Sequence, residues 1–164
     1  MDVFDEELLR FWRFCNQTQL KYIMIGGVAT NLHGFNRSTE DIDIWIEDTG
    51  ANRLKLQQVF EQYGWADVSS FKTIQFVPGW TYFHLDNGIR LDIMTTVKGL
   101  EEYSFDECLN AASIATIYDV DIPFLHLNQL IQAKQASNRP KDQIDVLALS
   151  KIKDLIEKRE AEDE

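Results

Sequence analysis

The sequence has only two cysteines, three prolines and no long apolar run, and these absences exclude several classes of protein. Two cysteines cannot build the disulfide framework of a small secreted domain. No stretch approaches the roughly 18 apolar residues that a membrane-spanning helix requires. The N-terminal segment is acidic and amphipathic, without the basic start and apolar centre of a signal peptide. We therefore expect a protein of the reducing cytoplasm that does not bind or span a membrane.

Proline-rich linkers, internal repeats and low-complexity runs are also absent, so nothing in the sequence marks a boundary between domains. The chain has 164 residues, of which 45% are hydrophobic, and this is enough for one well-buried core. We expect one domain over residues 1–164, with its core over about 18–126 and C-terminal helices over about 127–161.

Positive charge is in short supply, because 16 Lys and Arg face 27 Asp and Glu, for a formal net charge of −11. Proteins bind nucleic acid backbones largely by neutralising phosphates with Lys and Arg. The charge therefore disfavours generic binding to DNA or RNA and favours a small-molecule partner. Part of the acidity lies in the C-terminal EKREAEDE, so a local basic patch could still bind one RNA end.

Hydrophobic periodicity and turn residues predict alternating helices and strands. The predicted helices cover about residues 5–17, a short segment from Gly26, 49–63, 104–112 and everything from 127 onward. The predicted strands cover 21–25, 41–46, 81–86, 89–94, 114–118 and 122–125. Asn128 is the expected N-cap of the first C-terminal helix, and Arg139-Pro140 is expected to separate it from a second helix that begins near Lys141.

The most informative segment is residues 22–46, YIMIGGVATNLHGFNRSTEDIDIWI, where a strand ends at Gly26-Gly27 and another begins at Asp41. Alternate side chains of a strand share a face, so Asp41 and Asp43 project together. Carboxylates held this close repel each other unless a proton or a cation intervenes, and hard oxygen ligands suit Mg²⁺. The alternative is that both aspartates lie at a solvated strand end.

The glycine pair favours the ligand-binding interpretation. Gly26 and Gly27 let the backbone approach a ligand closely, and the amide groups at the start of the following helix favour phosphate. A tight turn without a ligand remains the alternative.

A third carboxylate is expected on a neighbouring strand, and Asp92 fits. Asn87-Gly88 lies between two alternating runs and predicts a hairpin with a two-residue turn. Asp92 lies on the outgoing strand between apolar residues, where simple surface decoration is not expected. Asp86 is the competing candidate, but its place beside Asn87-Gly88 suits an ordinary turn residue.

This combination resembles the nucleotidyltransferase superfamily typified by DNA polymerase beta, and especially its small bacterial branch of antibiotic adenylyltransferase-like proteins and toxins of toxin–antitoxin systems. The residues that carry the resemblance are Gly26, Gly27, Arg37, Thr39, Asp41 and Asp43. The resemblance implies an α/β (α+β) fold, in which helices flank a mixed, mostly antiparallel sheet and the C-terminus is helical.

The resemblance also implies the chemistry, which is Mg²⁺-dependent transfer of NMP from an NTP to a hydroxyl acceptor, with two metal ions bound beside the NTP. In this family an Asp-x-Asp strand and a third acid hold the metals, which implies that Asp41, Asp43 and Asp92 are catalytic and metal-binding. Gly26 and Gly27 would then hold the β and γ phosphates.

A Lys in one helix followed by Arg-x-Lys-Asp-x-x-Asp at the next occurs in the same bacterial branch. It implies that Lys134 and Lys141 face the phosphates. The alternative is that Asp142 and Asp145 form exposed local pairs with Lys141 or Arg139, which contribute only about 0–1 kcal/mol each.

Two loop residues and one aromatic leave alternatives open. Arg37 contacts the triphosphate, braces the carboxylates or forms a salt bridge that anchors its loop. Thr39 binds nucleotide or only fixes the turn. Trp80, which follows Pro78-Gly79, is either a core or rim aromatic or lies near a bound base.

Three interpretations of function follow. The first is an enzyme that uses a small-molecule acceptor or one specific macromolecular end. The second is a toxin that is paired with an antitoxin, and the third is a nucleotide-binding module of the same fold that has lost turnover. A homodimer is compatible with each, and the sequence identifies neither the NTP nor the acceptor.

Overall fold

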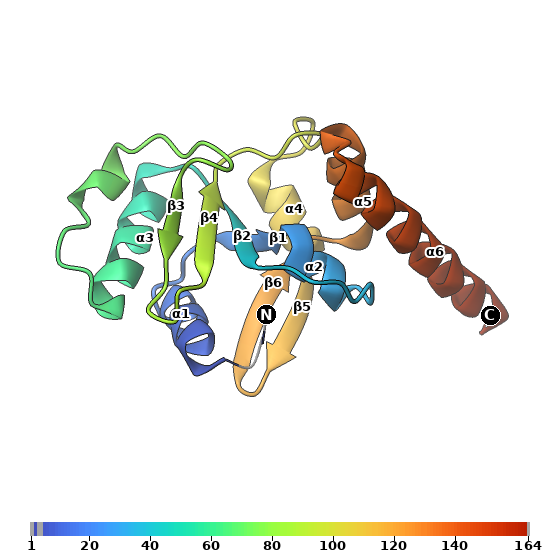
Figure 1. Cartoon of the computed structure of the whole chain (residues 1–164), viewed down its shortest axis with the longest axis horizontal. Helices are drawn as coiled ribbons and strands as arrows, with labels where there is room; N and C mark the ends of the chain where they lie inside the picture. Colours follow the sequence, from blue (N-terminus) through green and yellow to red (C-terminus); the bar gives the residue numbers. More distant parts are fainter. Residues whose placement is uncertain (1, 3–4, 164) are drawn as a thin grey trace.

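The computed structural model describes residue 2 and residues 5–163, so the outermost ends of the expected domain, residues 1, 3, 4 and 164, lie outside the described part. Within it, six strands form one sheet: β1 (Tyr22–Ile25), β2 (Asp41–Ile46), β3 (Tyr82–His84), β4 (Arg90–Met94), β5 (Ser113–Ile117) and β6 (Val120–Phe124). The strand order is β3-β4-β2-β1-β6-β5 (Figure 1). Three of the pairings are antiparallel, whereas β2 with β4 and β1 with β6 are parallel. The sheet is mixed and mostly antiparallel, as expected.

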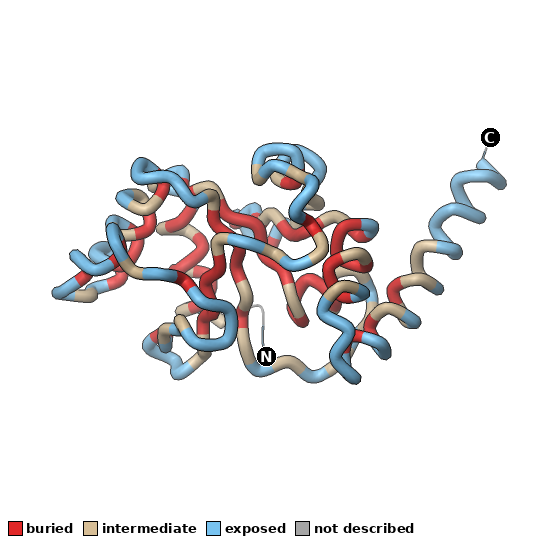
Figure 2. The backbone as a smooth tube through the Cα atoms, turned by 90° about the horizontal axis from the view of Figure 1, so that it is seen from above, coloured by how far each residue is buried: buried red, intermediate tan, exposed pale blue. Residues whose placement is uncertain are grey.

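Helices surround this sheet. They are α1 (Glu6–Gln17), α2 (Gly26–Leu32), α3 (Gly50–Tyr63), the 3₁₀ turn η1 (Ser69–Lys72), α4 (Phe105–Ala111), α5 (Leu127–Ser137) and α6 (Pro140–Glu162). The long α6 packs on α5 and then projects beyond the body, so that its last turns are exposed (Figures 1 and 2). None of the helices in residues 5–163 combines the length and apolar character needed to cross a bilayer.

The sequence explains the start of α1 and its place in the core. The Asp5 carboxylate accepts hydrogen bonds from the backbone N–H of Glu7 and Leu8 at 3.0 and 3.2 Å, which satisfies two of the free donors at the helix start. Its apolar stripe is buried in the main hydrophobic cluster and comprises Leu8, Leu9, Phe11, Trp12 and Cys15.

Strand β2 separates the core from the prospective site. Ile42 and Ile44 are fully buried, while Asp41 and Asp43 are partly exposed on the opposite face. The alternation read from the sequence is therefore the alternation in the structure, and the isoleucines fix the register that turns both carboxylates away from the core.

The hairpin between β3 and β4 differs from the prediction. The backbone N–H of Gly88 donates to the Leu85 carbonyl at 2.8 Å, and the Leu85 N–H donates to the Ile89 carbonyl at 2.9 Å. The loop therefore has three residues, with Asp86 and Asn87 at the centre of the turn and Gly88 at φ +82° as a bulge. The prediction of a two-residue turn at Asn87-Gly88 was wrong, because Gly88 is not in the turn itself but supplies the left-handed residue that follows it.

The start of α5 is also different. His126 is the N-cap, and its ring Nδ1 accepts from the Asn128 N–H at 3.1 Å. The predicted cap at Asn128 was wrong because Leu125 still donates to the Met24 carbonyl of β1, at 2.9 Å, so that the chain turns into the helix immediately after the sheet. Helix α6 begins at Pro140, with Arg139 as its N-cap.

Candidate active site

Two parallel strands bring the three predicted carboxylates onto one face. In the register of β2 and β4, Asp43 lies opposite Asp92 and Asp41 lies opposite Arg90. Residues paired in register project to the same side, and Asp41 shares that side with Asp43 because the two are separated by one residue. Asp92 is buried, with 5% of its surface exposed.

Crowding of these acids changes the protonation of Asp43. Burial raises the pKa of its carboxyl to about 6, and the negative charges of Asp92 and Asp41 add to the rise. The positive charges of Lys141 and Lys134 oppose it in part. A proton or a cation at this position would relieve the repulsion.

Asp92 has a counter-ion on its own strand. The guanidinium of Arg90 donates to both carboxylate oxygens at 3.1 and 3.2 Å, and it lies 3.9 Å above the ring of Tyr82. In this arrangement no three acidic, His or Cys side chains in the described residues come close enough together to hold a metal ion. Arg90 lies two residues before Asp92, so strand alternation puts both on one face, but the sequence analysis did not identify Arg90 as a partner.

The glycine pair leaves space for two side chains of the opposite segment. Gly26 adopts φ +70°, and a Cβ at this position would collide with the Asp43 carboxylate. A Cβ on Gly27 would lie 2.5 Å from the Thr39 hydroxyl oxygen. That hydroxyl in turn donates to the Asp41 carbonyl at 3.4 Å. The packing of β2 and its leading loop therefore requires both glycines, whatever the pocket binds.

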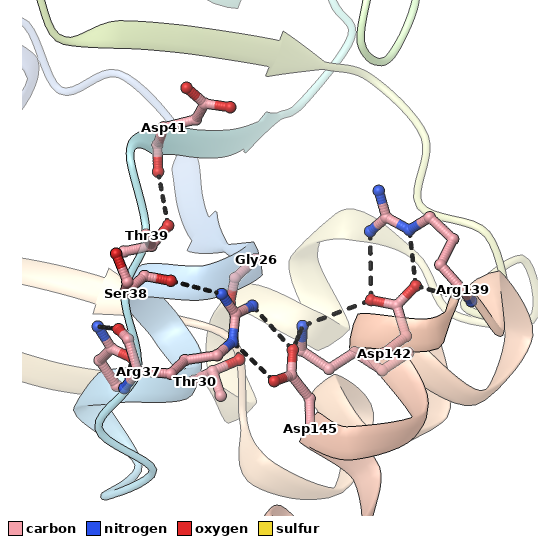
Figure 3. A network of polar contacts seen from close by, with 11 residues as sticks. Gly26, Thr30, Arg37, Ser38, Thr39, Asp41, Arg139, Asp142 and Asp145 are labelled. Atoms are coloured by element: carbon pink, nitrogen blue, oxygen red, sulfur yellow. Dashed lines mark hydrogen bonds and ion pairs between the residues drawn. The ribbon is translucent and has the colours of Figure 1, made fainter.

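A buried carboxylate connects the loop before β2 with the C-terminal helices (Figure 3). Arg37 donates to both oxygens of Asp145, from Nε at 2.7 Å and from Nη2 at 2.8 Å, and Lys134 Nζ donates at 2.6 Å. Asp145 has no exposed surface. Burial opposes its ionisation, but the hydrogen bonds from Arg37 and Lys134 outweigh this effect and lower its pKa.

Asp142 forms the second half of the same network. It accepts from the Arg139 side chain at 2.7 and 3.2 Å and from the Arg139 backbone N–H at 3.1 Å, while Lys134 lies 3.8 Å away. Burial again opposes ionisation, and the hydrogen bonds from Arg139 again prevail, so that the pKa of Asp142 is lowered.

These contacts bear on two of the alternatives left open by the sequence, the pairing of Asp142 and Asp145 and the salt bridge of Arg37. The alternative of exposed local pairs was wrong for Asp145, which is buried and whose partners come from other elements. Asp142 does have a local partner in Arg139, but Asp142 is itself buried. Arg37 forms the salt bridge that anchors its loop. The sequence could not show that Arg37 pairs with Asp145, because a pairing across 108 residues leaves no local pattern.

One cavity of about 650 Å³ is lined by every residue to which the sequence assigned a catalytic, metal-binding or nucleotide-binding role. These residues are Gly26, Gly27, Arg37, Thr39, Asp41, Asp43, Asp92, Lys134 and Lys141. The cavity also contacts Pro78 and Gly79 before β3 and the segment 96–98 after β4. The carboxylates come from the sheet and the lysines from α5 and α6, so acidic and basic side chains line the same cavity.

Comparisons with known proteins agree with this fold. The family described as nucleotidyltransferase of unknown function, DUF6036, matches residues 5–158. A crystal structure of TM1012 from Thermotoga maritima, described provisionally as a nucleotidyltransferase, matches with a TM-score of 0.57 at 18% sequence identity. The match covers 95% of this chain and 90% of TM1012. The lincosamide antibiotic adenylyltransferase LnuA, solved with lincomycin bound, has a TM-score of 0.57 at 19% identity, with 90% and 97% covered. No curated protein matches in sequence.

Proposed function

The chain belongs to the DUF6036 family of nucleotidyltransferases, and from this membership we propose that it transfers NMP from an NTP to a hydroxyl acceptor with the help of Mg²⁺. One observation supports the proposal above the others. The acidic and basic groups that such a reaction needs line a single cavity, with the acids on β2 and β4 and the bases on α5 and α6.

The acidic face is suited to divalent cations. Asp41, Asp43 and Asp92 offer hard oxygen ligands, and burial together with the charges of Asp92 and Asp41 raises the pKa of Asp43, so a bound cation would favour its ionised form. Mg²⁺ bound there would offset charge on the phosphates and lower the pKa of the acceptor hydroxyl. Asp92 is the proposed acceptor of the hydroxyl proton.

The glycine turn and the lysines are the proposed phosphate site. The backbone of Gly26 and Gly27 lines the cavity beside Asp43 and can approach the β and γ phosphates without an intervening side chain. Arg37 and Lys134 share Asp145, which offsets much of their positive charge. Lys141 is exposed and makes no ion pair within the described chain, so among the cations that the C-terminal helices bring to the cavity it is the one most available to phosphate.

The proposed acceptor is a small hydroxyl compound. The net charge of −11 disfavours a long polyanion, and LnuA, which has a similar fold, binds the small molecule lincomycin. Two buried free cysteines suit the reducing cytoplasm that we propose as the compartment. The toxin interpretation differs only in the acceptor, which would be a specific macromolecule, with an antitoxin as the controlling partner.

The ion pair of Arg90 with Asp92 favours a second candidate, a nucleotide-binding module without turnover. A guanidinium that occupies the third carboxylate supplies the positive charge that a metal would otherwise bring. In that case NTP would bind, but no NMP would be transferred.

Labelled nucleotides test the proposal directly. The protein is incubated with each α-labelled NTP, Mg²⁺ and a cell extract, and the labelled product is identified. We expect transfer from the native protein, its loss in Asp43→Asn and on addition of EDTA, and full retention in Asp154→Asn, an exposed acid on α6. Equal labelling by Asp43→Asn would refute the assignment, and NTP binding without transfer would favour the inactive module.

A further inference from the structure

Trp80 is exposed to solvent and directly follows Pro78 and Gly79, which line the cavity. Its exposed fraction is 82%, whereas Trp12 and Trp45 are buried at 1% and 5% and Trp65 packs on Phe60. An indole is among the largest apolar groups in a protein, and leaving one in water forgoes a large stabilisation. Val77 and Tyr82 in the same stretch of chain are also exposed, at 39% and 45%, and grouped apolar exposure beside a cavity points to a ligand that covers it.

The turn that carries Trp80 is firmly placed. The Thr81 hydroxyl donates to the Gln75 carbonyl at 3.1 Å and accepts from the Val77 N–H at 2.8 Å. The Trp80 N–H donates to the Val77 carbonyl at 3.0 Å. These contacts hold the two ends of the turn together, so the backbone that carries the indole is fixed in place.

The same turn is joined to the carboxylates. Pro78 and Gly79 line the cavity, and Arg90 donates to the Gly79 carbonyl at 3.1 Å while its guanidinium also binds Asp92. Trp80 is the next residue in the chain after Gly79. The backbone of Trp80 therefore lies at the edge of the cavity on the side of Asp92.

The sheet order gives the direction across the cavity. The glycine turn follows β1, the three acids lie on β2 and β4, and the Trp80 turn leads into β3, which is next to β4 at the end of the sheet (Figure 1). Phosphate site, metal site and Trp80 therefore follow one another from β1 to β3. Helices α5 and α6 bring their lysines to the cavity on the side of the glycine turn, because Asp145 of α6 pairs with both Lys134 and Arg37.

We propose that Trp80 is the platform on which the base of the nucleotide stacks. The inference rests on the proposed function, and it follows from the connectivity of an NTP. With the β and γ phosphates at Gly26 and Gly27 and the α phosphate at the carboxylates, the nucleoside extends away from the glycine turn, toward Pro78 and Trp80. An indole face stacks on any base, so the site binds all four bases and holds purines more tightly than pyrimidines.

Calorimetry with and without a base tests this assignment. ATP, UTP and inorganic tripolyphosphate are titrated, each with Mg²⁺, into the native protein, Trp80→Ala and Trp80→Phe. We expect Trp80→Ala to weaken ATP binding by about tenfold and UTP binding by less, and to leave tripolyphosphate binding within about twofold. Trp80→Phe should restore most of the ATP affinity, because phenylalanine keeps a flat aromatic face.

Tyr118→Ala is the control for removal of an exposed aromatic, since Tyr118 lies between β5 and β6, at the far end of the sheet. Unchanged ATP affinity in Trp80→Ala would overturn the stacking role while leaving the proposed function intact. An equal loss for ATP and tripolyphosphate would also overturn it, because it would mean that the turn supports the phosphate site. If neither ligand bound the native protein, the proposed function would itself fail.

Discussion

Asp43 makes the stability of the metal-free protein depend on pH in an unusual direction. Its pKa of about 6 in the folded state lies above the ordinary value of 3.8. Between these pH values the folded protein retains a proton that the unfolded chain has released. The free energy of unfolding therefore falls as the pH rises from about 4 to 6, by up to about 3 kcal/mol from this group.

The substitution Asp43→Asn should remove this penalty, because the amide resembles the protonated carboxyl and carries no charge. In EDTA at pH 7 we expect the variant to be more stable than the native protein by about 1–3 kcal/mol, and the two to converge near pH 4. Urea unfolding at several pH values measures this. Asp154→Asn should leave the pH profile unchanged, and the same slope in Asp43→Asn would show that Asp43 titrates normally.

The glycine turn should be intolerant of even one methyl group. Gly26→Ala forces a side chain against Asp43 at positive φ, and Gly27→Ala forces one against Thr39, so each should lower the free energy of unfolding by about 1–3 kcal/mol. Gly50→Ala at the start of α3 meets nothing within 4 Å and should change it by less than about 0.5 kcal/mol. Thermal unfolding of the three variants measures these changes. An unchanged unfolding temperature in Gly27→Ala would contradict the expected collision with Thr39.

At the scale of elements, Asp145 joins α6 to α5 and to the loop that precedes β2. Asp145→Asn leaves Arg37 and Lys134 without their shared anion, and breaking a buried pair in this way costs about 3–5 kcal/mol. We expect a large loss of stability in urea, with Asp154→Asn as the exposed control on the same helix.

Amide exchange of residues 35–40 provides the second measurement on Asp145→Asn. The loop should exchange faster in this variant, because it loses its tie to α6. Unaltered exchange and stability would show that Arg37 is held by other contacts.

Local signals predicted elements well and their partners poorly. Strand β2 and the Gly26 start of α2 follow from alternation and from the glycine pair, and both agree with the structure. The predicted cap of α5 was wrong because the pairing of Leu125 with β1, which leaves no mark on the local sequence, decides where the chain turns. The predicted length of the β3–β4 loop was wrong because Gly88 takes the left-handed position after the turn. The three acids were found through their strand parity.

The Asp145 network could not be predicted in the same way. Its partners lie on different elements, and the pairing of Arg37 with Asp145 spans 108 residues. Arg90 was within reach of sequence reasoning, because it is two residues from Asp92 on one face of a strand. The roles of all these residues in nucleotide binding stay predictions.

At the scale of the whole molecule, charge should exclude generic nucleic acids. Lys134 and Arg139 are engaged with Asp145 and Asp142, so Lys141 is the cation of the C-terminal cluster that remains unpaired in the described chain. We predict weak binding of unspecific RNA at about 150 mM salt in fluorescence anisotropy. Tight binding that is insensitive to sequence, and that persists in Lys141→Ala, would contradict this expectation.

The long span between Arg37 and Asp145 has a consequence for biosynthesis. A ribosome makes the chain from its N-terminus, so the glycine turn and the Asp-x-Asp strand emerge long before the carboxylate that anchors their loop. The cavity cannot take its final form until α6 has left the exit tunnel. A nascent or prematurely terminated chain that ends before Asp145 would therefore present the acidic strand with Arg37 lacking its anchoring carboxylate.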